Sequence, residues 1–328
     1  MSLPLFHSPR SIAFLDDDPD YLQMLALMLP ERWNVRLYAR IDDCLAQLRP
    51  EAAAWEDDAW AQQHIIDRWR QEATPLVPQV LDYWARQVQA RYALTHACVA
   101  DYSMPEMDGL QVLSMLSEWP GLRVLLTGQA DEQIAVDAFN RALIDQFLPK
   151  QAVDVAERLV AVLQHMPSSA NARCSQIWRS TLTPAQHAQL RVPSTARAVQ
   201  QLLAQQGFVE YVVLGDPYGI LGRTAGGQVG WLQLEPVGGL AELEQLAESV
   251  GTGPDVLQEI RAGRQLIDLE LGQAMGRGTP PRLRPAFSLG QEGVLLGALF
   301  SVDAAHAPPA DSSYGAWLAR QPVRAVRQ

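Results

Sequence analysis

The stretch Cys98-Val-Ala-Asp-Tyr-Ser-Met-Pro-Glu-Met-Asp-Gly109 decides the fold. Three apolar residues lead into Asp101, a turn with Pro105 and the pair Asp108-Gly109 follows, and an amphipathic run begins at Leu110. This pattern predicts a buried strand, a loop and a helix. Ligands of open parallel α/β sheets bind at the carboxyl ends of the strands, so we expect Asp101 to lie at that edge of a sheet.

Three other apolar segments also end in polar side chains. They are Ile12–Asp18, which ends in three acids that include Asp16 and Asp17, Val124–Gly128, which contains Thr127, and Phe147–Lys150. If these segments are parallel strands, their polar ends meet at one edge of the sheet. The sequence therefore predicts a cluster of carboxylates with one hydroxyl and one ammonium.

This set of groups has a chemical use. Clustered carboxylates suit Mg2+, which binds a few carboxylates and keeps water or phosphate oxygens in the rest of its shell. An aspartate can act as a nucleophile that accepts a phosphoryl group. A lysine neutralises charge on phosphoryl oxygens, and a hydroxyl donates a hydrogen bond to one of them. Lys150 is the single lysine among 26 basic residues.

From about Ser11 to His165 the sequence resembles the receiver domain of two-component response regulators. The resemblance implies a histidine kinase as partner and a receiver that catalyses its own phosphorylation and dephosphorylation. It also implies a role for each matching residue. Asp101 would be the phosphoacceptor, and Mg2+ would be bound by Asp16, Asp17, Asp101 and the backbone carbonyl of Ser103. Thr127 would be the switch hydroxyl, Lys150 the phosphate-binding lysine and Phe147 the rotating aromatic side chain.

The expected receiver spans residues 9–165 and has a flavodoxin-like α/β fold, (βα)5 with a five-stranded parallel sheet. Within it, Trp33–Tyr38 alternates apolar and polar residues, which predicts an edge strand. Asp17 and Asp101 are 84 positions apart, roughly twice the separation in an ordinary receiver. The extra residues, 49–93, carry four of the nine tryptophans. Helical spacing, with a break at Pro75 and Pro78, is found for Ile65, Ile66, Trp69, Val77, Val80, Leu81, Trp84 and Val88. We interpret them as a helical hairpin, in which the tryptophans either pack the two helices together or form an arm for a homodimer or another partner.

The rest of the chain is expected to form a linker (166–193), a small α+β domain (194–303) and a mobile tail rich in Pro and Ala (304–328). The central domain reads as a helix, a β-meander from Phe208 to Leu234, two helices and a final β pair, an order loosely similar to PAS-type sensor modules. This likeness is at the level of fold and names no activity.

Composition narrows the function classes. A chain of 328 residues suggests two domains. Residues 1–166 hold 24 acidic and 13 basic residues, and the remainder holds 13 of each, so neither part has the basic footprint typical of nucleic-acid binding. No apolar run is long enough for a membrane span, no signal-peptide pattern is present, and three distant cysteines suggest no disulfide framework. We expect a cytoplasmic protein without membrane or nucleic-acid contacts.

The sequence favours a response regulator that signals by protein contact with an unidentified downstream partner through its C-terminal domain. No separate enzymatic output is recognised. Two alternatives remain: a dimeric adaptor with vestigial phosphorylation, and a small-ligand sensor in the C-terminal domain. The five polar residues of the predicted site argue against the adaptor because all of them are present.

Overall fold

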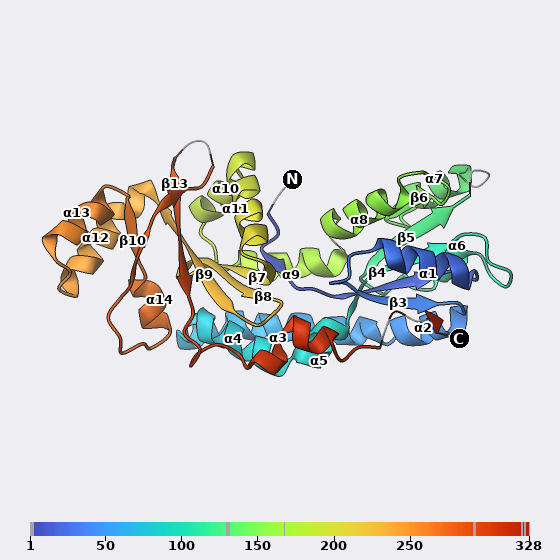
Figure 1. Ribbon diagram of the computed structural model, residues 1–328, viewed down its shortest axis with the longest axis horizontal. Helices are drawn as coiled ribbons and strands as arrows, with labels where there is room; N and C mark the ends of the chain where they lie inside the picture. Colours follow the sequence, from blue (N-terminus) through green and yellow to red (C-terminus); the bar gives the residue numbers. More distant parts are fainter. Residues whose placement is uncertain are drawn as a thin grey trace. The chain divides into compact units, whose positions relative to one another are not determined.

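A computed structural model describes residues 3–128, 132–166, 168–290, 293–322, 324 and 326–327. The chain forms two compact units, each assembled from separated segments (Figure 1). The parallel-sheet unit consists of Pro9–Trp60, Gln89–Arg173 and Trp317–Gln328. The antiparallel-sheet unit consists of Met1–Ser8, Ala61–Val88 and Cys174–Ala316.

The parallel-sheet unit has a flavodoxin-like fold, as the sequence predicted. Its strands all run parallel. In spatial order they are β14 (Val326–Arg327), β3 (Asn34–Tyr38), β2 (Ser11–Leu15), β4 (Thr95–Asp101), β5 (Leu122–Thr127) and β6 (Gln146–Pro149). The order from β3 to β6 is that of a doubly wound sheet, with chain reversals that place β2 and β4 at its centre.

Helices cover both faces of this sheet because successive side chains of a strand point to opposite faces. Ile12 and Phe14 of β2 pack in one core with α1 and α8, whereas Ala13 and Leu15 pack in another with α2, α6 and α7. The helices are α1 (Pro19–Met28), α2 (Ile41–Leu48), α6 (Gly109–Ser114), α7 (Glu132–Asn140) and α8 (Val155–His165). The near-continuous apolar strands follow from this double burial.

The prediction that Trp33–Tyr38 forms an edge strand was wrong. Strand β3 lies between β2 and β14, so the end of the chain supplies the edge. Residues 304–328, expected to be a mobile tail, contain η3 (Ala310–Ser312), α15 (Tyr314–Leu318) and β14. The guanidinium of Arg324 donates to the backbone carbonyls of Leu29 and Trp33, both at 3.1 Å, which ties this segment to the end of α1.

The insertion has the helix–break–helix form that the sequence predicted. It comprises α3 (Glu51–Glu72), α4 (Leu76–Arg86) and α5 (Val88–Ala93). Its apolar residues, however, do not form an arm: Ile65, Ile66 and Trp84 are buried in the core of the antiparallel-sheet unit. Trp60 stays 51% exposed. Packing within the chain therefore accounts for most of the apolar surface on which the dimer hypothesis depended.

The antiparallel-sheet unit is α+β, as expected, and contains the predicted meander. Its main sheet has the order β1 (Phe6–His7), β7 (Phe208–Gly215), β8 (Tyr218–Thr224), β9 (Val229–Pro236), β13 (Leu295–Ser301) and β12 (Phe287–Ser288), and a separate pair joins β10 (Gln265–Ile267) to β11 (Leu283–Pro285). The remaining helices of the chain are α9 (Ser169–Arg179), α10 (Pro184–Arg191), α11 (Pro193–Gln205), η2 (Val237–Gly239), α12 (Leu240–Ser249), α13 (Pro254–Arg261) and α14 (Leu269–Ala274).

Residues 166–193, expected to be a linker, thus hold α9 and α10. A capping box explains the start of α10: Thr183 Oγ1 accepts from the Gln186 amide, and the Gln186 side chain accepts from the Thr183 amide. Within the described residues, no helix has the length and apolar character needed to cross a bilayer.

Candidate functional site

The predicted polar residues lie at the carboxyl edge of the parallel sheet. Asp101 is the last residue of β4 and Thr127 the last of β5. Asp16 directly follows β2, and Lys150 directly follows β6. Because the four strands are parallel and adjacent, their ends converge, which is the geometry that the sequence predicted for them.

Three aspartates form the acidic centre of this edge. Carboxylate oxygens of Asp16, Asp17 and Asp101 lie within 4.8 Å of one another. Asp16 and Asp101 are buried, at 2% and 4% exposure, whereas Asp17 is exposed. Two buried carboxylates and one solvent-exposed carboxylate suit a hard cation that keeps part of its water shell, and Mg2+ is such a cation.

Lys150 supplies the positive charge of the cluster. Its Nζ lies 2.7 Å from Asp16 Oδ2 and 3.2 Å from Asp101 Oδ1. Burial alone would lower the pKa of Lys150, but the Asp16 and Asp101 carboxylates outweigh burial and raise it. Burial also raises the pKa of the Asp16 carboxyl, and the Lys150 ammonium only partly offsets this effect. The site therefore holds more negative charge than its own lysine compensates, which fits the binding of a further cation.

The loop after β4 fixes the backbone of Asp101. The Gly109 amide donates to the Tyr102 carbonyl at 3.0 Å, and the Asp108 carboxylate caps α6 by accepting from the Gln111 amide at 2.7 Å. A Cβ on residue 109 would lie 2.0 Å from the Asp101 carbonyl oxygen. Only glycine therefore lets the chain pass so close to the strand end that carries the carboxylate.

Thr127 has a buried hydroxyl without a hydrogen-bond partner. The residue is fully buried, and Oγ1 makes no hydrogen bond in the described part of the chain. Its backbone carbonyl accepts from the Lys150 amide at 2.8 Å, which joins the two strand ends. A buried donor without an acceptor costs free energy, so this hydroxyl marks a position where an added acceptor would be favourable.

The other two predicted residues, Phe147 and Ser103, are close in sequence to Lys150 and to Asp101, respectively. Phe147 is half-buried and packs against the core that β2 shares with α2, α6 and α7. Ser103 is exposed in the loop two residues after Asp101.

The structure adds two residues that sequence reasoning missed. Lys150 Nζ lies 4.3 Å from the centroid of the Tyr21 ring, a cation–π contact. Burial, followed by the charges of Asp16 and Asp101, raises the pKa of Tyr21 to about 12, so its phenol stays neutral. Asp18 caps α1 by accepting from the amides of Asp20 and Tyr21. The triple aspartate before Pro19 was a signal for this cap, whereas nothing in the sequence pointed to Tyr21.

Comparison with solved structures supports the fold over the whole chain. The response regulator LqsR from Legionella pneumophila is 22% identical, the match covers 98% of each chain, and the TM-score is 0.70. The BeF3-activated receiver domain of DrrB (18% identity, TM-score 0.30) and a CheY-like receiver domain from Methanospirillum hungatei JF-1 (17%, 0.31) each match 48% of this chain and 95% of their own. No family model and no curated protein matches the sequence. The chain thus shares the fold of LqsR over nearly its whole length, while its chemistry has to be argued from its own residues.

Proposed function

We propose that this protein is a response regulator of a two-component phosphorelay that accepts a phosphoryl group on Asp101. The observation that carries the proposal is the convergence of Asp16, Asp17 and Asp101 with Lys150 at one sheet edge, beside the buried hydroxyl of Thr127. Mg2+ would be held by the three aspartates and by the Ser103 carbonyl, and it would neutralise charge on the phosphoryl oxygens.

In the reaction, an Asp101 carboxylate oxygen forms a bond to phosphorus while the phosphorus–nitrogen bond of a kinase phosphohistidine breaks and the imidazole leaves. Lys150 already lies 3.2 Å from Asp101. Its ammonium needs only a small movement to bind an oxygen of the new phosphoryl group. Its raised pKa keeps it protonated throughout the neutral range.

The switch that follows uses the buried hydroxyl. A phosphoryl oxygen on Asp101 supplies the acceptor that Thr127 Oγ1 lacks, so the hydroxyl is drawn toward it. Half-buried Phe147 then follows Thr127, and the surface formed by β5, α7 and β6 changes between two states.

Output is proposed to pass to a downstream protein through the antiparallel-sheet unit, without contact to nucleic acid. Dimerisation stays a prediction from the sequence. An adaptor with vestigial phosphorylation is the weaker reading, because such a protein has no need to keep Thr127 unpaired and Lys150 between two buried carboxylates.

The test is the intact mass of the full chain after incubation with acetyl phosphate and Mg2+. We expect the mass of one phosphoryl group to be added to the wild type and to Asp108→Asn, and none to Asp101→Asn. Asp108→Asn is the matched control because it makes the same change in the same loop, and asparagine also caps helices well. A wild type that is folded, binds Mg2+ and gains no mass would refute the proposal.

A further inference from the structure

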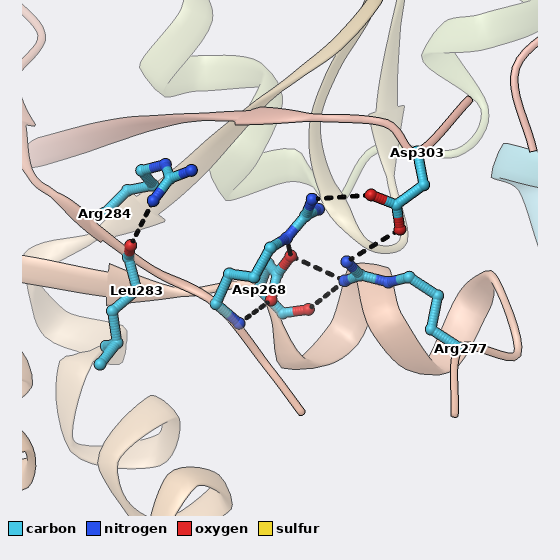
Figure 2. Close-up of polar contacts among 6 residues, drawn as sticks. Asp268, Arg277, Leu283, Arg284 and Asp303 are labelled. Carbon is cyan, nitrogen blue, oxygen red and sulfur yellow. Dashed lines mark hydrogen bonds and ion pairs between the residues drawn. The ribbon is translucent and has the colours of Figure 1, made fainter. Parts of the chain in front are cut away.

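A partly buried network of two arginines and two aspartates lies outside the site described above, in the antiparallel-sheet unit (Figure 2). Asp268 accepts from the Arg282 amide at 2.6 Å, from Arg282 Nε at 2.8 Å and from Arg277 Nη2 at 2.7 Å. Asp303 lies on the other side of both guanidinium groups, 3.1 Å from Arg282 Nη1 and 3.9 Å from Arg277 Nη1.

The two aspartates differ in how firmly they are held. Asp268 is fully buried and joins the end of β10 to the start of β11, which gives it a structural role. The Asp303 side chain is 43% exposed and makes one hydrogen bond to the pair, together with a long ion pair. Asp303 can therefore swing into water at small cost.

Arg277 and Arg282 have more donors than this network satisfies. Arg277 is only 5% exposed, yet its Nε and Nη1 make no hydrogen bond, and neither does Arg282 Nη2. A buried donor of this kind costs free energy, because it loses its hydrogen bonds to water. The single buried carboxylate of Asp268 balances one of the two guanidinium charges, and the loosely held Asp303 offsets the other.

An apolar groove lies beside these arginines. With Asp303 in place, the space between Arg277 and Arg282 is too small for a water molecule, and it shares Met275 and His306 with a larger hollow of about 280 Å3. The wall of the larger hollow is mainly apolar and consists of Pro78, Leu81, Ala85 and residues 307–309, with one acid, Asp82. The groove therefore has a cationic end at Arg277 and Arg282 and an apolar channel, which is the larger hollow.

From this combination we infer that the groove binds a small amphiphilic carboxylic acid. The carboxylate displaces Asp303 and binds Arg277 and Arg282, whose forked donors match a carboxylate. The apolar body lies between α4 and residues 307–309. A single negative charge fits the single excess positive charge, and Asp82 on the wall disfavours ligands with more. In this arrangement Asp303 acts as an internal competitor for the ligand.

The proposal is tested with octanoate as the probe, on the full chain, by calorimetric titration and thermal unfolding. We expect octanoate to bind the wild type, Asp303→Asn to bind it at least about tenfold more tightly, and Arg282→Gln at least about tenfold more weakly. Glu248→Gln removes an exposed carboxylate on α12 and should leave the affinity of the wild type unchanged. The neutral amide octanamide should bind at least tenfold more weakly than octanoate.

Arg282→Gln can weaken octanoate binding simply by disrupting the structure of the network, so a second variant leaves both arginines in place. Ala85→Phe fills the apolar channel from a half-buried position on α4 and should weaken octanoate binding while leaving thermal stability near that of the wild type. The inference is overturned if octanoate binds neither the wild type nor Asp303→Asn, or if Ala85→Phe binds it as well as the wild type. Inorganic phosphate binding as tightly as octanoate would also overturn it, because the apolar channel would then contribute nothing.

Discussion

Replacing Lys150 with glutamine tests whether the acidic centre is built to hold a second cation. The ammonium is the partner of two carboxylates, at 2.7 Å from Asp16 and 3.2 Å from Asp101, and both carboxylates are nearly buried. Glutamine keeps most of the side-chain volume and removes the charge. Two buried carboxylates then face each other without a counter-ion, unless Mg2+ is present.

The magnitude follows from the burial of the three groups. Removing one partner of a fully buried ion pair costs roughly 3–5 kcal/mol. The Lys150 side chain is 22% exposed, so water screens part of the interaction and we expect a loss of about 2–3 kcal/mol in free energy of unfolding without metal. The ammonium also repels a divalent cation at the same carboxylates, so its removal should tighten Mg2+ binding by about tenfold.

The assay is urea unfolding of the full chain, with EDTA or with Mg2+, followed by tryptophan fluorescence. Because the chain has two units, the relevant transition is the one that Mg2+ shifts in the wild type. Arg158→Gln is the control, since Arg158 of α8 makes an exposed ion pair with Asp154, the residue before this helix, and its loss should change stability by less than about 0.5 kcal/mol. Unchanged metal-free stability together with unchanged or weaker Mg2+ affinity would refute the reasoning.

Three further changes follow from single observations. Thr127→Val removes the unpaired buried hydroxyl, so stability measured by urea unfolding should stay level or rise by about 1 kcal/mol, while the conformational response to phosphorylation, followed by hydrogen exchange, should be lost. Gly109→Ala places a Cβ 2.0 Å from the Asp101 carbonyl, so we expect a loss of about 3 kcal/mol or more in unfolding experiments and slower phosphorylation by acetyl phosphate. Burial and two neighbouring glutamates raise the pKa of Glu235 to about 7 from 4.5. The folded state thus binds more protons than the unfolded state between these values, and stability falls as pH rises through this window. Glu235→Gln should therefore change little at pH 4 and stabilise by about 2–3 kcal/mol above pH 7.

The candidate site was predictable because its signal is local. Each of its side chains stands at the end of a short apolar strand, so a pattern of a few residues fixed both the strand and the place of its last residue. Parallel pairing then brought Asp16, Asp101, Thr127 and Lys150 to one edge without any knowledge of the loops between them. Tyr21 was missed for the same reason. It contacts Lys150 from the first turn of α1, and the sequence of a helix does not indicate which cation a tyrosine in it will contact.

The parts that sequence could not supply depend on long-range packing. The spacing of Ile65, Ile66 and Trp84 indicates an amphipathic helix equally well whether its apolar side meets a second copy, a partner or another segment of the same chain. Strands β1 and β14 are two residues long, so they have no periodicity to detect, and only their pairing with β7 and β3 defines them. Local sequence predicts elements, but it does not predict which core each element joins.

The acidic centre and the arginine network resemble each other in one physical respect. Each holds buried polar groups that its own neighbours satisfy only in part: the Thr127 hydroxyl and surplus carboxylates in one, and the guanidinium donors of Arg277 and Arg282 in the other. A chain selected for stability alone would replace such groups with apolar ones, because unmet buried donors and charges cost free energy. In the two proposals above, a ligand satisfies these groups: a phosphoryl group with Mg2+ in the first site and an external carboxylate in the second.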